Sequence, residues 1–100
     1  MKMSADESKT ALIVIGNSIT EGRLQMVLRK RGWASEVVKY GDKAVDDFVA
    51  LRPDLEFIAV DIPTLDGHVA ALEMRESDPK ARIVFVSSRG RIDLAEDAAY

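Results

Sequence analysis

Cysteine is absent from the 100 residues of this chain. Disulfide bonds and thiolate metal sites are therefore excluded, and the composition is compatible with a reducing cytoplasm. Long hydrophobic runs are also absent, because the longest, residues 11–15, is much shorter than the roughly 20 residues of a membrane-spanning helix. The N-terminus lacks the charged-then-apolar order of a signal peptide, since Asp6 and Glu7 interrupt it. We therefore expect a cytoplasmic protein that does not cross a membrane.

Neither sign of charge dominates the sequence. The chain has 14 Lys and Arg against 17 Asp and Glu, which gives a net charge of −3. This balance provides no broad basic surface, so we expect no direct binding to nucleic acid. The hydrophobic fraction of 47% is ordinary for a folded chain and allows one small core. We expect a disordered polar segment at residues 1–9 and a single domain at residues 10–100.

Three short apolar runs predict buried β-strands. They are rich in β-branched or aromatic residues, and they lie at residues 11–15, 57–60 and 83–86. Continuous apolar runs of this length are typical of strands that are buried on both faces of a parallel sheet. The run at residues 35–40 is weaker, with two valines among polar residues, and predicts an edge strand.

Helical periodicity fills the segments between these strands. The first two helices are expected at about residues 20–31 and 42–51, and the third is expected to end at Asp78 before a proline. Ser18 or Thr20 is expected to cap the first helix. The apolar faces predicted for the three helices are formed by Leu24, Val27 and Leu28, by Val45, Phe48 and Val49, and by Val69 and Leu72 with Ala70 and Ala71.

The predicted elements alternate between strand and helix along the chain and end in a fourth helix from about Ile92 to Tyr100. Alternation of this kind favours right-handed crossovers and a parallel sheet with helices on both faces, an α/β fold. Ligands bind such sheets beyond the carboxyl ends of the strands. The segments that could carry function are therefore residues 16–18, 61–67 and 87–90.

Motifs near the middle of the chain resemble the centre of a response-regulator receiver domain. They are Pro53 and Asp54 before the third strand, and the string Pro-Thr-Leu-Asp-Gly at residues 63–67 before a helix. Residues 11–33 and 81–98 also resemble the family's first and fourth strand–helix units, in the right order. The resemblance implies a flavodoxin-like (CheY-like) fold with three α/β/α layers, here without the fifth strand and the fifth helix.

The chemistry of that family needs three acidic groups. Two adjacent carboxylates after the first strand help to hold a divalent cation, normally Mg²⁺, and a third carboxylate attacks the phosphoryl donor. In this sequence the acidic pair aligns with Ile15 and Gly16, or with Gly16 and Asn17 after a shift of one residue. The acceptor, counted back from Pro63, aligns with Ala59. The resemblance thus implies a pseudo-receiver, which has lost the phosphorylation chemistry.

Two further residues bear on this interpretation. Ser87 aligns with the hydroxyl residue that contacts the phosphoryl group in the family. Asp61 is the alternative phospho-acceptor, although its use requires two extra residues before it and two fewer after it. An active receiver phosphorylated at Asp61 therefore stays open as a second hypothesis. A flavodoxin-like domain that binds a small ligand or cofactor is the third.

We predict a non-enzymatic module that needs no cofactor or metal and binds a signalling protein in a two-component-type pathway. Without a fifth strand, the run at residues 83–86 lies at an open edge of the sheet, which invites pairing with another chain. The sequence therefore predicts either a fragment of a longer protein or a homodimer through the fourth strand or fourth helix. The expected partner-binding residues, by resemblance, are Ser88, Arg89, Ile92, Leu94 and Tyr100.

Overall fold

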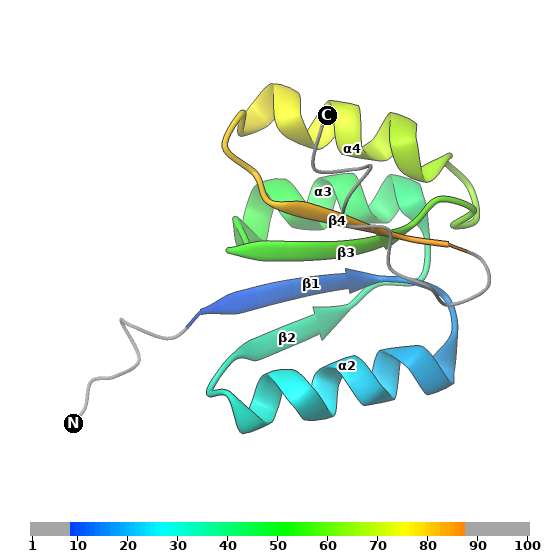
Figure 1. Cartoon of the computed structure of the whole chain (residues 1–100). Coiled ribbons are helices and arrows are strands. Elements are labelled where there is room, and N and C mark those ends of the chain that lie inside the picture. Colours follow the sequence, from blue (N-terminus) through cyan, green and yellow to red (C-terminus); the bar gives the residue numbers. More distant parts are fainter. Residues whose placement is uncertain (1–8, 88–100) are drawn as a thin grey trace.

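The computed structural model of the protein describes residues 9–87, which form a four-stranded parallel sheet and three helices. In chain order the elements are β1 (Thr10–Val14), α2 (Ser18–Lys30), β2 (Ala34–Val37), α3 (Gly41–Leu51), β3 (Leu55–Ala59), α4 (Gly67–Ser77) and β4 (Ile83–Val86). The strands lie in the order β2-β1-β3-β4. Helix α2 packs on one face of the sheet, and α3 and α4 pack on the other (Figure 1). The predicted α/β fold is confirmed.

The strands form where the apolar runs predict them. Residues 11–14 of β1 are completely buried, because this central strand is covered on both faces. Strand β2 lies at an edge of the sheet, as predicted, and its residues are alternately exposed and half-buried. It begins one residue earlier and ends three residues earlier than the predicted run at residues 35–40. Val38 is still buried and donates to the Ile13 carbonyl, whereas the next two residues, Lys39 and Tyr40, are exposed.

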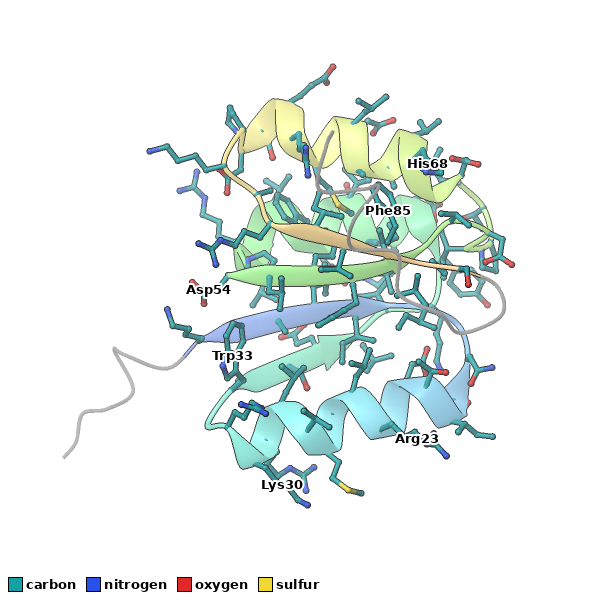
Figure 2. All side chains as sticks on the ribbon, viewed as in Figure 1. Arg23, Lys30, Trp33, Asp54, His68 and Phe85 are labelled. Carbon is teal, nitrogen blue, oxygen red and sulfur yellow. The ribbon has the colours of Figure 1, made fainter. Side chains whose placement is uncertain are left out.

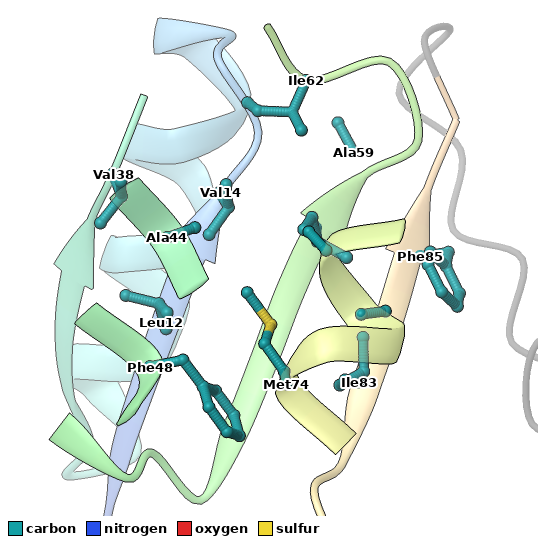
Figure 3. Close-up of a cluster of buried hydrophobic side chains, with 13 residues drawn as sticks. Leu12, Val14, Val38, Ala44, Phe48, Ala59, Ile62, Met74, Ile83 and Phe85 are labelled. Atoms are coloured by element: carbon teal, nitrogen blue, oxygen red, sulfur yellow. The ribbon is translucent and has the colours of Figure 1, made fainter. Parts of the chain in front are cut away.

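The main hydrophobic core lies between the sheet and helices α3 and α4 (Figure 3). Phe48 of α3 and Met74 of α4 are almost completely buried there, against Leu12 and Ile58 of the sheet. A smaller core lies beneath α2 on the opposite face. Its fully or nearly buried members are Ala11, Ile13 and Leu28, with Trp33 and Phe57 partly buried against them.

Only part of the apolar face predicted for helix α4 meets the core, namely Ala70 and Ala71. Two alanines and Met74 are buried, whereas Val69 and Leu72 are exposed. The prediction for Val69 and Leu72 is wrong because Gly67 brings the start of the helix very close to the sheet. A Cβ atom at Gly67 would lie 2.3 Å from the carbonyl oxygen of Ala59. This contact fixes the rotation of α4, so that its small residues and Met74 meet the sheet.

The other two helices also have narrower apolar faces than predicted. Val27 of α2 and Val49 of α3 are exposed, while their neighbours Leu28 and Phe48 are buried. Each of these two helices therefore buries only a narrow stripe, and the two valines lie on the side that faces solvent. The remaining members of the two predicted faces, Leu24 and Val45, are partly buried against the cores.

Asn17 caps helix α2, in place of the predicted Ser18 or Thr20. Its side-chain oxygen Oδ1 accepts a hydrogen bond from the Thr20 N–H at 3.0 Å. Asn and Ser are equally good capping residues, so composition alone does not distinguish adjacent candidates. The cap places the amide of Asn17 beside the carboxyl end of β1.

Several predictions concern segments that lie outside residues 9–87. They are the disorder of residues 1–9 (except Lys9), the fourth helix, and partner binding by Ser88, Arg89, Ile92, Leu94 and Tyr100. Within residues 9–87, β4 has a neighbouring strand on one side only, which is β3. In the same range, no helix is both long enough and apolar enough to cross a bilayer.

Glu56 is an ionisable residue that is buried in the main core. It lies in β3, next to Leu12 of β1 and Ile83 of β4 in the sheet register, and it has no exposed surface. Neither of its carboxyl oxygens has a hydrogen-bond partner. Burial raises the pKa of Glu56 to about 8, because removal from water disfavours the charged form. The carboxyl group is therefore mostly protonated at neutral pH.

Candidate functional site

A cavity of about 290 Å³ lies at the carboxyl ends of β1, β3 and β4. This is the edge of a parallel sheet at which ligands are expected. The structure brings all six predicted site positions together in its wall. The lining residues are Ile15, Gly16, Asn17, Thr20, Ala59, Asp61, Pro63, Val86 and Ser87.

The part of the wall after β1 carries no acidic side chain. Ile15 is half-buried, and Gly16 has a positive φ of 81°, a conformation that favours glycine. The amide oxygen of Asn17 is already used to cap α2. In either register, therefore, no carboxylate stands at the positions of the family's acidic pair. Ile15 is apolar, Gly16 has no side chain, and the Asn17 amide oxygen already accepts a hydrogen bond.

The end of β3 offers no nucleophile at the aligned position. Ala59 is the last residue of the strand and is 2% exposed, and its methyl group belongs to the main core. A methyl group cannot accept a phosphoryl group. The backbone of Ala59 also lies directly against Gly67 at the start of α4.

Asp61 carries the one carboxylate among the lining residues of this cavity. It is exposed and lies in the loop after β3, two positions beyond Ala59. Ser87, which follows β4, is half-buried in the same wall. Asp61 and Ser87 thus share the cavity, as the hypothesis of an alternative phospho-acceptor requires.

The donor groups of this cavity do not fit a magnesium ion. Mg²⁺ takes oxygen ligands in a near-octahedral arrangement and usually needs one or two carboxylates with further oxygen donors. Within residues 9–87 there is no group of three or more His, Asp or Glu side chains that could hold a metal. Asp61 supplies a single carboxylate, and the Asn17 oxygen accepts from Thr20 instead.

A partly buried ion pair lies beside the cavity, next to its lining residue Gly16. The carboxylate of Glu21, in the first turn of α2, accepts a hydrogen bond from Lys39 Nζ at 2.6 Å through Oε1. Its other oxygen, Oε2, accepts from the Gly16 N–H at 2.9 Å. The Glu21 side chain is 5% exposed, whereas that of Lys39 is 51% exposed. This pair was not predicted from the sequence, although Glu21 lies at helical spacing from Leu24 and Leu28, and a charge on an apolar stripe is a usable signal.

A second set of contacts joins the loop before α3 to the loop before α4. The Gly41 N–H donates to the Pro63 carbonyl at 2.8 Å. The Thr64 hydroxyl donates to Asp42 Oδ1 at 2.7 Å, and Thr64 has a positive φ of 76°. Hydrogen bonds from Thr64 and from the Lys43 N–H lower the pKa of Asp42 from its ordinary value. Three loops at this edge of the sheet are therefore tied to one another by polar contacts.

A larger apolar groove of about 470 Å³ lies elsewhere, between α4 and β4. It is lined by His68, Ala71, Leu72, Arg75 and Phe85. The ring of His68 lies over that of Phe85, with 4.7 Å between the ring centroids (Figure 2). The Nδ1 atom of His68 is 3.6 Å from Asp66 Oδ1, and both side chains are exposed. The six predicted site positions line the smaller cavity and not this groove, so we assign the candidate site to the smaller cavity.

Comparison with known proteins points to receiver domains. No family model matches the chain. The chemotaxis protein CheY of Bacillus subtilis is 31% identical over 90 residues, a match that covers 87% of this chain and 73% of CheY. The autoinducer 1 sensor kinase/phosphatase LuxN of Vibrio harveyi is 32% identical over 82 residues. That match covers 82% of this chain but only 10% of LuxN, so the chain spans about a tenth of that relative.

Solved structures give the same result for the fold. The receiver domain of a sensor histidine kinase from Pseudomonas aeruginosa matches with a TM-score of 0.73 and 25% identity. The match covers 79% of this chain and 66% of the other. That structure has a magnesium ion coordinated in its active-site cleft. The cavity described above lacks the carboxylates that would favour such an ion.

Proposed function

The chain belongs to the CheY-like response-regulator receiver family of two-component signalling, and from this membership we propose that it acts without being phosphorylated, by binding a protein partner. The observation that carries the proposal is Ala59. It ends the third strand at the aligned acceptor position and presents only a methyl group. A receiver without an acceptor carboxylate has no covalent step to perform, so we assign it no enzymatic activity.

The wall after β1 supports the same proposal. Phosphoryl transfer develops negative charge that a metal ion normally offsets. Ile15, Gly16 and Asn17 supply no carboxylate to hold such an ion. The loss therefore affects the acceptor and the metal-binding positions together. A fold that retains its architecture without this chemistry is best suited to protein–protein interaction.

One observation favours a second function, an active receiver that is phosphorylated at Asp61. The Asp61 carboxylate is exposed in the wall of the same cavity as Ser87. Against this function, Asp61 stands in the loop beyond β3 rather than at the end of the strand. Among residues 9–87, no second carboxylate lines the wall of the cavity.

Intact-mass measurement separates the two functions. The chain is incubated with acetyl phosphate and Mg²⁺, with Bacillus subtilis CheY as a positive control. We expect no phosphoryl adduct on the wild type. A stoichiometric adduct that disappears in Asp61→Asn would overturn the proposal and establish the second function. Native mass spectrometry of the same sample tests the third hypothesis, because a retained small ligand would appear as a fixed mass increment.

The proposed partner is a signalling protein, and association with a second copy is the alternative. Within residues 9–87, strand β4 has a strand neighbour on one side only. The unpaired backbone groups of an edge strand can pair with another chain. Sedimentation velocity over a range of concentrations distinguishes these forms. A monomer at all concentrations would contradict the homodimer and leave a different protein as the partner.

A further inference from the structure

Both carboxyl oxygens of the buried Glu21 side chain have partners. One oxygen receives the ammonium group of Lys39 at 2.6 Å, and the other receives the backbone N–H of Gly16 at 2.9 Å. A buried carboxylate is costly unless it is both paired and hydrogen-bonded. Glu21 meets both conditions.

The two partners of Glu21 belong to different loops. Gly16 lies in the loop between β1 and α2 and forms part of the cavity wall. Lys39 lies in the loop between β2 and α3. Glu21 itself lies in α2, and its carboxylate therefore bridges the loop before this helix to the loop after β2. Contacts of Gly41 and Asp42 with residues 63 and 64 continue the connection to the loop before α4.

We propose that Glu21 and Lys39 form an internal latch, which fixes the conformation of the loop after β1 without a metal ion. The Lys39 ammonium supplies the positive charge at this edge of the sheet, and the Glu21 carboxylate transmits the constraint to the Gly16 backbone. The inference rests on the proposed function in one respect. A receiver that takes no phosphoryl group and no metal needs its own side chains to hold this loop.

A second pair of a lysine and a carboxylate within residues 9–87 shows how the Glu21–Lys39 pair differs from an ordinary surface contact. Lys43 and Asp47 are one helical turn apart on α3, at 3.4 Å, with side chains 66% and 29% exposed. Their contact lies within one helix and joins no loops. Exposed pairs of this kind contribute little, because water and salt screen them. Lys43 is therefore the matched control for Lys39.

Amide hydrogen exchange of Gly16, followed by NMR on the full chain, tests the latch. We expect Glu21→Leu to accelerate exchange at Gly16 by about tenfold, because the amide loses its acceptor. Lys39→Met should accelerate it by a smaller factor, and Lys43→Met should leave it unchanged. Lys39→Met changes a half-exposed side chain, so this variant folds even if Glu21→Leu does not. Addition of millimolar Mg²⁺ to the wild type should change neither the exchange rate nor the chemical shift of Gly16.

Equal Gly16 exchange rates in the wild type and in both latch variants would overturn the inference. Slower exchange of Gly16 on addition of Mg²⁺ would also overturn it, because a metal would then set the loop. Failure of the proposed function has a different signature, namely a phosphoryl adduct in the mass spectrum. The two results can therefore be told apart in the same protein.

Discussion

Glu21 and Glu56 are both buried, with 4% and 0% of their surfaces exposed, yet their carboxyl groups have opposite surroundings. Glu21 lies at the carboxyl edge of the sheet and binds an ammonium group and a backbone N–H. Glu56 lies within the sheet among apolar side chains, and neither oxygen has a partner. Burial raises the pKa of Glu56 to about 8. The same residue type is thus a stabilising bridge at one place and a destabilising group at the other.

This difference separates the polar edge of the sheet from its core. At the edge, charges are compensated within the chain, so the loops around the cavity are held by specific contacts. In the core, Glu56 occupies a place that an apolar side chain would fill without desolvation cost. We infer that stability is lost at Glu56, near the start of β3, and that the polar groups of Glu21 at the edge with the candidate site are satisfied. Four predictions test this comparison.

The largest expected effect is the pH dependence that Glu56 imposes on folding. The unfolded chain releases this proton near the ordinary pKa of 4.5, while the folded chain keeps it until about pH 8. The unfolded state therefore binds fewer protons across this window, and the free energy of unfolding falls as the pH rises, by at most about 5 kcal/mol. Urea unfolding followed by circular dichroism measures the fall, and the difference from Glu56→Leu isolates the contribution of Glu56. Parallel pH curves for the two proteins would contradict the assignment.

Replacement of Glu56 by leucine should stabilise the protein at neutral pH. Leucine has a similar volume and removes the cost of a buried, unpartnered carboxyl group, so we expect a gain of about 3 kcal/mol. Chemical denaturation gives the free energy of unfolding for both proteins. The control is Glu36→Leu on the exposed side of β2, which should change stability by no more than about 0.5 kcal/mol. A loss of stability in Glu56→Leu would show that the carboxyl group has a partner in solution.

The same substitution at Glu21 should have the opposite sign. Glu21→Leu removes the acceptor of the Gly16 N–H and the partner of Lys39, and we expect a loss of about 1 to 2 kcal/mol. The measurement is again chemical denaturation, at neutral pH. If leucine stabilises both sites equally, the distinction between the edge and the core fails.

The smallest effect is expected for Lys39→Met. Because the Lys39 side chain is half exposed, we expect a loss of about 1 kcal/mol or less, and the loss should shrink at high salt. Unfolding curves at low and high ionic strength measure this difference. Lys43→Met should show almost no loss at either salt concentration. A loss that does not depend on salt would mean that Lys39 acts through its alkyl chain and not through its charge.

The fold was predictable because three of the four strands carry a continuous apolar run. Runs of this type, separated by helical periodicity, allow few arrangements other than a parallel α/β sheet. The grouping of Ile15, Ala59 and Ser87 in one cavity was predictable for a related reason, since the carboxyl ends of neighbouring parallel strands meet at one edge. These features depend on local sequence and on general rules of topology.

Features that depend on precise distances between elements were not predictable. The exposure of Val69 and Leu72 follows from the close approach of Gly67 to Ala59, which no periodicity reveals. The Glu21–Lys39 contact depends on the path of the loop after β2. Glu56 gave no signal of its own, because a single acidic residue in a short run is equally compatible with the exposed end of a strand.

Trp33 is the only tryptophan of the chain, and its position makes it a selective optical reporter. It precedes β2 and packs against the core beneath α2, at the amino ends of the strands and so at the end opposite the cavity (Figure 2). Its emission should shift when α2 separates from the sheet. A small molecule in the cavity should leave the emission unchanged. A change in Trp33 fluorescence on partner binding would therefore mean that the effect had travelled the full length of the strands.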